Sequence, residues 1–258
     1  MDTWQWQTWQ GLPYLTCTLL DRWPHAFLTR QFGGRSPRDL SPILQPDSQT
    51  YCVKQVHSNI VLDSETLSPV EEQPTGWPQA DGLFSQKPGR SLWVSSADCT
   101  PVLLADDRRG WVAAIHAGWR GTAARIVPVA IEMFLDRGSA IADLRIALGP
   151  AISGEMYQVS TEVGARVGAT VLDPVPDSDT EICDRLFALP HAPLLADPEP
   201  GKVRLDVRRV IALQVLKLGA TADRIAIAPQ CTYRHDDRFF SYRRTGDKDV
   251  QRSGIVAV

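Results

Sequence analysis

The amino-acid sequence predicts one domain of the α+β or layered α/β class. Short apolar runs of strand length recur along the chain, whereas helical periodicity is confined to two segments. No shift in composition marks a domain boundary, and a chain of 258 residues that is 43% hydrophobic can bury a substantial core. We therefore expect a single domain over residues 1–258.

The predicted strands are apolar runs of about five residues, the usual strand length. They lie at 51–56, 91–96, 101–105, 111–116, 144–148, 225–229, 238–242 and 254–258. Two stretches rich in proline or glycine, residues 33–50 and 173–202, are expected to be surface loops.

The two predicted helices are identified by apolar residues three and four positions apart. In the first, Thr122 is the expected N-cap, Gly138 follows the end, and Pro128 should kink the helix or delay its start. In the second, Asp206 is the expected cap and Gly219 ends the helix.

Composition and charge exclude several classes of partner. The net charge of −3 and the pI near 6.0 do not favour binding to nucleic acid or to anionic membranes. The five cysteines are scattered and odd in number, which indicates reduced thiols and a cytoplasmic protein. Residues 1–15 lack the pattern of a secretory signal. We expect a monomer or small homo-oligomer.

Three potential metal ligands each stand at the end of a predicted strand. His116 ends an apolar run and precedes the turn AGWRG, Cys99 lies between two runs, and His57 closes the run YCVKQVH. Two histidines and a thiolate with a vacant fourth position are typical of catalytic zinc. These residues alone also allow two other interpretations. Cys99 and His116 could form a nucleophilic pair, or the three residues could have separate structural roles.

Four segments resemble one family when they are read together. They are ADGLFSQKPGRSLWVSSADCTPVLLAD, AAIHAGWRGTAARIV, LGPAISGEMYQV and CTYRHDDRFFSYRRTG. The chain is similar to the YfiH-like proteins, first described as multicopper polyphenol oxidases (laccase-domain proteins) and now regarded as purine nucleoside phosphorylases and adenosine deaminases. The resemblance covers residues 51–258. Upstream, Thr29, Arg30, Gly33 and Gly34 keep part of a TTRxGG-type segment, whereas the SLNLG-type stretch that follows it in relatives is absent.

The resemblance implies a layered α/β/β/α sandwich with mixed sheets and a metal held by His57, Cys99 and His116. It implies zinc as the cofactor, with copper as the alternative. The implied activity is phosphorolysis of adenosine, inosine, guanosine and methylthioadenosine, together with deamination of adenosine. The expected partners are therefore a purine nucleoside and phosphate. Some members of the family are connected with editing of peptidoglycan precursors.

Four further residues are candidates for the chemistry around such a metal. Arg120 and Arg30 are candidates for binding the anionic substrate, and Arg120 also for a catalytic role. Asp81 and Asp98 are candidates for orienting the histidines or for transferring protons.

Three alternatives to this function remain. One is a metal-independent cysteine hydrolase using Cys99 and His116, and another is a binding module without catalysis. A copper-dependent polyphenol oxidase is the third, but a set of four coppers needs roughly ten histidines. The chain has five.

Overall fold

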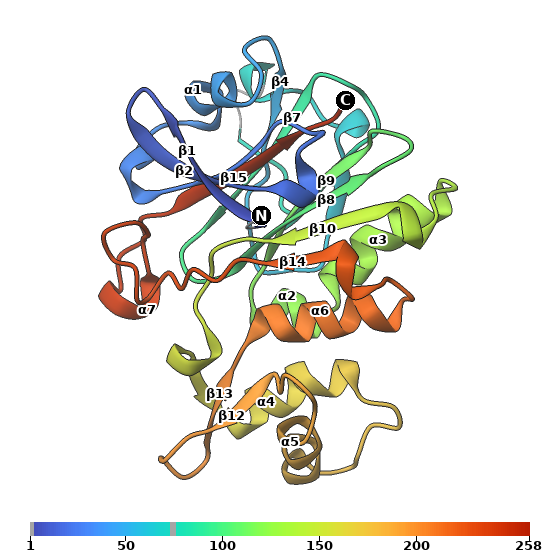
Figure 1. The fold of residues 1–258 in the computed structure, drawn as a ribbon, viewed down its shortest axis with the longest axis vertical. Helices are drawn as coiled ribbons and strands as arrows, with labels where there is room; N and C mark the ends of the chain where they lie inside the picture. The colour runs from blue at the N-terminus through green and yellow to red at the C-terminus, as the bar shows by residue number, and fades with distance from the viewer. Residues whose placement is uncertain (1–2, 73–75) are drawn as a thin grey trace.

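The computed structural model describes residues 3–72 and 76–258 and consists of stacked sheets flanked by helices (Figure 1). One six-stranded sheet has the order β1-β2-β3-β15-β7-β4 and the other β14-β10-β8-β9-β6-β5. The first contains β1 (Trp4–Trp9), β2 (Leu12–Cys17), β3 (His25–Leu28), β4 (Gln49–Tyr51), β7 (Arg90–Ser96) and β15 (Gln251–Val256). The second contains β5 (Val61–Asp63), β6 (Gly82–Ser85), β8 (Thr100–Asp106), β9 (Val112–Ala117), β10 (Leu144–Leu148) and β14 (Ile225–Ile227).

Alternation of side chains along the central strands explains why the sheets stack. In β8, Leu103 and Ala105 enter the apolar cluster between the two sheets, whereas Val102 and Leu104 face the cluster beneath the helices. Both faces of this sheet are therefore covered, and all seven residues of β8 are buried.

Helices complete the outer layers. α2 (Trp119–Ala123), α3 (Ile126–Asp136) and α6 (Val207–Lys217) cover the second sheet, while α1 (Pro37–Leu40) lies against the first. α7 (Tyr242–Thr245) is a short turn near the C-terminus. The expected layered α/β/β/α sandwich with mixed sheets is confirmed, since parallel and antiparallel pairs occur in both large sheets.

A smaller group of elements lies at one end of the molecule (Figure 1). It comprises α4 (Thr161–Gly168), α5 (Asp179–Phe187) and the three-stranded sheet of β11 (Gln158–Ser160), β13 (Lys202–Leu205) and β12 (Leu194–Ala196). The prediction of a surface loop over 173–202 was thus wrong. Ser178 caps α5, whose Ile182 and Leu186 are buried.

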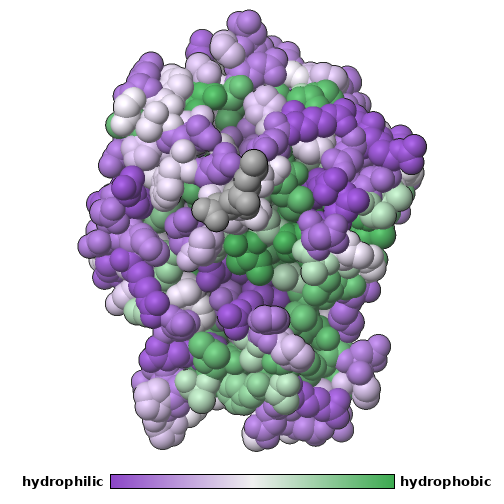
Figure 2. All heavy atoms as spheres, viewed as in Figure 1, coloured by the Kyte–Doolittle hydropathy of each residue, from purple (hydrophilic) through white to green (hydrophobic). Residues whose placement is uncertain are grey.

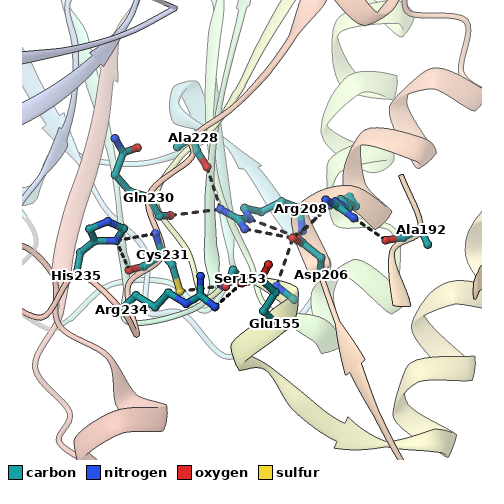
Figure 3. Close-up of polar contacts among 12 residues, drawn as sticks. Ser153, Glu155, Ala192, Asp206, Arg208, Ala228, Gln230, Cys231, Arg234 and His235 are labelled. Carbon is teal, nitrogen blue, oxygen red and sulfur yellow. Dashed lines mark hydrogen bonds and ion pairs between the residues drawn. The ribbon is translucent and has the colours of Figure 1, made fainter. Parts of the chain in front are cut away.

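The first turn of α6 is fastened by an ion pair (Figure 3). Asp206 accepts hydrogen bonds from the amides of Arg208 and Arg209, as predicted for the cap, and pairs with the buried Arg208 guanidinium. Arg208 also donates to the carbonyls of Ala228 and Gln230, which ties the helix to the loop after β14. On this face, apolar side chains gather over α6 and β14 (Figure 2).

Four other local predictions were wrong. Residues 52–56 form no strand, since β4 ends at Tyr51, and residues 238–241 form a loop that leads into α7. Thr122 lies inside α2, and the left-handed Arg125 precedes α3 instead. The delayed start expected from Pro128 is confirmed, because α3 begins at Ile126 and Pro128 falls in its first turn, where the missing N–H has no helical acceptor. The loop predicted over 33–50 contains α1 and the start of β4.

Among the described residues, no helix has the length and apolar character needed to cross a membrane.

Candidate metal centre and the chambers beside it

The three predicted ligands come together at one edge of the sandwich. His116 is on β9, Cys99 lies in the turn between β7 and β8, and His57 follows the isolated bridge at Lys54. Their ligand atoms all lie within 4.8 Å of one another. Cys99 Sγ is 4.0 Å from His57 Nε2, and the centroids of the His57 and His116 rings are 4.9 Å apart. We call these three residues the metal group.

Asp81 fixes two members of the metal group at once. Its carboxylate is fully buried and accepts a hydrogen bond of 2.9 Å from His116 Nδ1. It also accepts from the backbone amides of Val56, His57 and Ser58 and from the Ser58 hydroxyl. Because Nδ1 of His116 is occupied in this way, Nε2 is the atom left to coordinate a metal.

These bonds explain why His57 adopts a conformation that the apolar run does not predict. Its φ is +62°, in the left-handed region that non-glycine residues seldom occupy. Three consecutive amides converge on the single carboxylate of Asp81, and this requires a tight turn in place of a strand.

Gln55 holds the other side of the same loop, a role that sequence reasoning missed. Its side-chain amide donates to the Ser95 carbonyl and accepts from the Ser95 amide, both at 2.7 Å. The side chain thus pairs with β7 as a neighbouring backbone would. A polar residue inside an apolar run, two positions before a candidate ligand, was the only signal available.

Electrostatics within the metal group favour a thiolate. Burial raises the pKa of Cys99, but the charge and hydrogen bond of His116, aided by His57, outweigh it and bring the pKa to about 6. Burial lowers the pKa of His116, whereas the Cys99 thiolate and Asp81 raise it to about 9. Without a metal, the group is therefore an imidazolium–thiolate pair backed by a carboxylate.

The surroundings of the group fit a bound cation. The donors are two imidazole nitrogens and one thiolate, which suit zinc or copper rather than magnesium or calcium. Gly118 keeps the space beside them open, because a Cβ there would lie 2.8 Å from Cys99 Sγ and 3.2 Å from His57 Cδ2. The residue that begins the turn after β9 must therefore be a glycine.

Two cavities meet at the metal group. The wide chamber has a volume of about 880 Å³ and is bordered by the group together with Trp77, Ser96 and Arg252. The narrow chamber has a volume of about 240 Å³ and is bordered by Trp119, Arg120, Tyr157 and Arg243. The residues common to both linings are His57, Ala97, Cys99 and Tyr242.

The remaining predicted residues occupy different places. Arg120 lines the narrow chamber, but Arg30 lines neither chamber and lies over the Phe240 ring, with a hydrogen bond to the Asp236 carbonyl. Asp98 lines the narrow chamber and does not contact a histidine of the metal group. Its carboxylate accepts from the Thr232 hydroxyl at 2.6 Å and from the Arg243 amide at 2.7 Å.

Tyr157 is a second residue that sequence reasoning missed. Burial, with the Cys99 thiolate adding to it, raises the pKa of Tyr157 to about 12. Its hydroxyl is therefore protonated at neutral pH and can donate a hydrogen bond. It lies in the segment LGPAISGEMYQV, but nothing local distinguishes it from a packing aromatic residue.

Comparison with known proteins identifies the family. Residues 38–257 match the family described as multi-copper polyphenol oxidoreductase laccase. A Synechocystis protein named purine nucleoside phosphorylase is 50% identical over 99% of this chain and 98% of its own length. The chain belongs to this family.

Two further proteins are similar to this chain. An adenosine deaminase from an unknown prokaryote is 28% identical over 68% of this chain and 62% of its own length. The crystal structure of YlmD from Geobacillus stearothermophilus superposes with a TM-score of 0.83 at 24% identity. The superposition covers 100% of this chain and 99% of that one, which supports the fold.

Proposed function

We propose that this member of the laccase-like family is a zinc-dependent purine nucleoside phosphorylase that also deaminates adenosine. The observation that carries the proposal is the metal group, backed by Asp81 and open to two chambers. The names of the relatives support purine nucleosides as the substrate class. The proposed substrates are adenosine, inosine, guanosine and methylthioadenosine.

Zinc is the proposed metal because the group leaves a fourth position for substrate or water, as catalytic zinc sites do. When bound there, it supplies a Lewis acid that stabilises negative charge on an oxygen of the reactants. His57 Nε2, Cys99 Sγ and His116 Nε2 hold it, and Asp81 holds the two histidines in place. Copper is the alternative metal.

The two reactions differ in what replaces the leaving group. In phosphorolysis, a phosphate oxygen bonds to C1′ of the ribose, and the C1′–N9 bond breaks with its electron pair going to the purine, which takes up a proton. In deamination, water adds at C6 and ammonia leaves. Arg120 is the proposed ligand for the anionic reactant, since it borders the narrow chamber next to the metal group.

We infer that neither Asp81 nor Asp98 moves a proton in the reaction. Both oxygens of Asp81 and both oxygens of Asp98 already accept hydrogen bonds from this chain. We propose that both act by positioning other groups.

Metal content and turnover test the proposal together. Purified protein should contain about one zinc per chain, measured by atomic emission, and should convert adenosine and phosphate to adenine and ribose 1-phosphate. Cys99→Ala should lose both the metal and the activity. A Cys99→Ala protein that keeps its zinc contradicts the metal assignment, and zinc-loaded protein that converts no purine nucleoside contradicts the substrate class.

The same geometry favours a second candidate, a cysteine hydrolase. Asp81, His116 and Cys99 stand in the order of an acid, a base and a nucleophile, with the Asp81–His116 contact at 2.9 Å. Such an enzyme would be inactivated by a thiol alkylator and indifferent to chelators, whereas the zinc enzyme loses activity with a chelator and regains it with zinc. A multicopper oxidase is disfavoured, because only two of the five histidines belong to the metal group. Cytoplasmic location and a role in peptidoglycan editing stay predictions.

A further inference from the structure

The two chambers differ in size in a way that separates the two substrates of phosphorolysis. Small-molecule clefts in proteins usually measure about 300–1,000 Å³. The wide chamber, at about 880 Å³, lies within this range and can admit a nucleoside. The narrow chamber, at about 240 Å³, lies below it and suits a small ion.

The aromatic rings of the narrow chamber are already covered by guanidinium groups. Arg120 lies 4.4 Å from the Trp119 ring and Arg243 lies 4.8 Å from the Tyr157 ring. Rings used in this way hold arginine side chains in place, and a purine could take the face that a guanidinium covers only by displacing that side chain. The narrow chamber therefore presents two guanidinium groups, while the carboxylate of Asp98 in the same lining is already bonded to Thr232 and to the Arg243 amide.

Arg243 is the better placed of the two arginines. Its Nη1 donates to the Gln158 carbonyl at 2.8 Å, and the Tyr157 ring fixes the plane of the guanidinium. Its backbone amide is held by Asp98, next in sequence to the ligand Cys99. Within the described parts of the chain, Nε and Nη2 have no hydrogen-bond acceptor, so one edge of the fork is free for an anion.

The neighbouring Arg244, in the same turn, differs from Arg243 because its guanidinium is engaged in holding the loop. It donates to the carbonyls of Thr232, Tyr233 and Phe239 and so closes the loop on itself. Of the two consecutive arginines, Arg243 is the one that borders the narrow chamber.

The wide chamber offers the complementary features. Trp77 lies on its wall and the Ser96 hydroxyl, on a residue only 3% exposed, has no partner among the described residues. A buried hydroxyl without a protein partner is ready to bond a ligand. A nucleoside here and an ion in the narrow chamber would meet at His57 and Cys99, the members of the metal group that line both chambers.

We propose that the narrow chamber is the subsite for inorganic phosphate, with Arg243 as its main recognition residue and Arg120 beside it, and that the nucleoside enters through the wide chamber. The proposal rests on the phosphorylase function proposed above. It assigns the two reactants to different sides of the metal group.

The two reactions of the enzyme provide the test. Arg243→Gln should lower kcat/KM for phosphate in phosphorolysis at least tenfold more than kcat/KM for adenosine in phosphate-free deamination. Arg243→Lys keeps the positive charge but lacks the planar set of guanidinium donors, so its kcat/KM for phosphate should lie between those of Arg243→Gln and the wild type. Zinc content is measured in each variant. Equal losses in both reactions, or an unchanged KM for phosphate, would overturn the proposal.

Arg109→Gln is the matched control. Arg109 is exposed, lies 4.6 Å from the Trp111 ring and donates one hydrogen bond of 2.7 Å to the Gly138 carbonyl, so it repeats the contacts of Arg243 away from the chambers. This variant should match the wild type in both reactions. A loss of phosphate affinity equal to that of Arg243→Gln would show a general charge effect and refute the subsite.

Calorimetry with inorganic phosphate separates the subsite from the reaction. Zinc-loaded wild type without nucleoside should bind phosphate, and Arg243→Gln should bind at least tenfold more weakly. If phosphate binds at Arg243 but no purine nucleoside is converted, the phosphorylase function fails and the subsite stands. If wild type and Arg243→Gln bind phosphate alike, the subsite fails whatever the enzyme converts.

Discussion

Asp81 and Asp98 are two buried aspartates beside the same metal group, and they hold different halves of the site. Asp81 accepts hydrogen bonds from His116 Nδ1 and from the amides around His57, so it positions two residues of the metal group. Asp98 receives the Thr232 hydroxyl and the Arg243 amide, so it positions the C-terminal segment that borders the narrow chamber. The difference teaches that the metal group and the lining of the narrow chamber are supported by separate carboxylates.

The largest effect is expected from Asp81→Asn. Asparagine keeps the shape of the side chain, but one carboxylate oxygen is replaced by an NH₂ group. This group cannot accept a hydrogen bond from His116 Nδ1 or from the loop amides. Loss of such support typically lowers metal affinity 10–100-fold, and we expect about 100-fold because Asp81 supports two ligands at once. Competition with a chromophoric chelator measures this. If the variant binds zinc as tightly as the wild type, Asp81 does not support the metal group and the two aspartates do not differ in this way.

Acid unfolding of the metal-free protein is the next test. Burial raises the pKa of Asp81, but hydrogen bonds from His116 and Ser58 outweigh it and hold the pKa at about 2. Since the folded pKa is below the unfolded value, the ionised carboxylate stabilises the fold above about pH 4, and this stabilisation is lost as the pH falls towards 2.

The expected contribution is about 2 kcal/mol, from a shift of nearly two pKa units. Urea unfolding between pH 5 and pH 2 should show it as a decline in the free energy of unfolding that is steeper in wild type than in Asp81→Asn. If the free energy of unfolding falls equally steeply with pH in the two proteins, ionised Asp81 does not contribute to acid stability.

Asp98→Asn is the matched substitution on the other half of the site. Asparagine tolerates the left-handed backbone at this position, where φ is +86°, so the change tests the carboxylate itself. We expect zinc affinity to stay within about threefold and KM for phosphate to rise about tenfold, equivalent to the loss of about 1.4 kcal/mol. If Asp98→Asn lowers zinc affinity as much as Asp81→Asn does, the two aspartates do not have separate roles.

The smallest effects are expected from two glutamines that make the same kind of contact. Gln55 pairs with both backbone groups of Ser95, and Gln251 pairs with both backbone groups of Phe240, at 2.8 and 3.3 Å. Alanine at either position should reduce the free energy of unfolding by about 1–2 kcal/mol.

Only Gln55→Ala should also weaken zinc binding, by about threefold, because its loop carries His57. Chelator competition and urea unfolding on the same preparations distinguish the two variants. If Gln251→Ala weakens zinc binding equally, the effect reflects overall stability and not the placement of the ligand.

Sequence patterns predicted the parts of the fold that depend on local periodicity. The runs at 144–148 and 101–105 became β10 and β8, and the Asp206 cap and Gly219 bracket α6 as expected. Each of these segments buries the apolar face that its own sequence defines.

The errors arose where a distant residue decides the local structure. The segment before His57 is bent by Asp81, more than twenty positions away, and the loop at Phe240 is held by the side chain of Gln251, eleven positions away. Helix α5 was missed because prolines on both sides of it suggested a loop. The division of the site into two chambers depends on side chains from separate segments, such as Trp77 and Arg243, and no local pattern can reveal it.

The bonds from Asp81 to the loop of His57 and to His116 have a consequence for how the protein acquires its metal. Since protein contacts assemble the candidate ligands in advance, metal loading should require little refolding. Imidazole and thiolate donors bind copper more strongly than zinc. The metal recovered from cells should therefore follow its supply, and growth in copper-enriched medium should exchange one ion for the other without altering the fold.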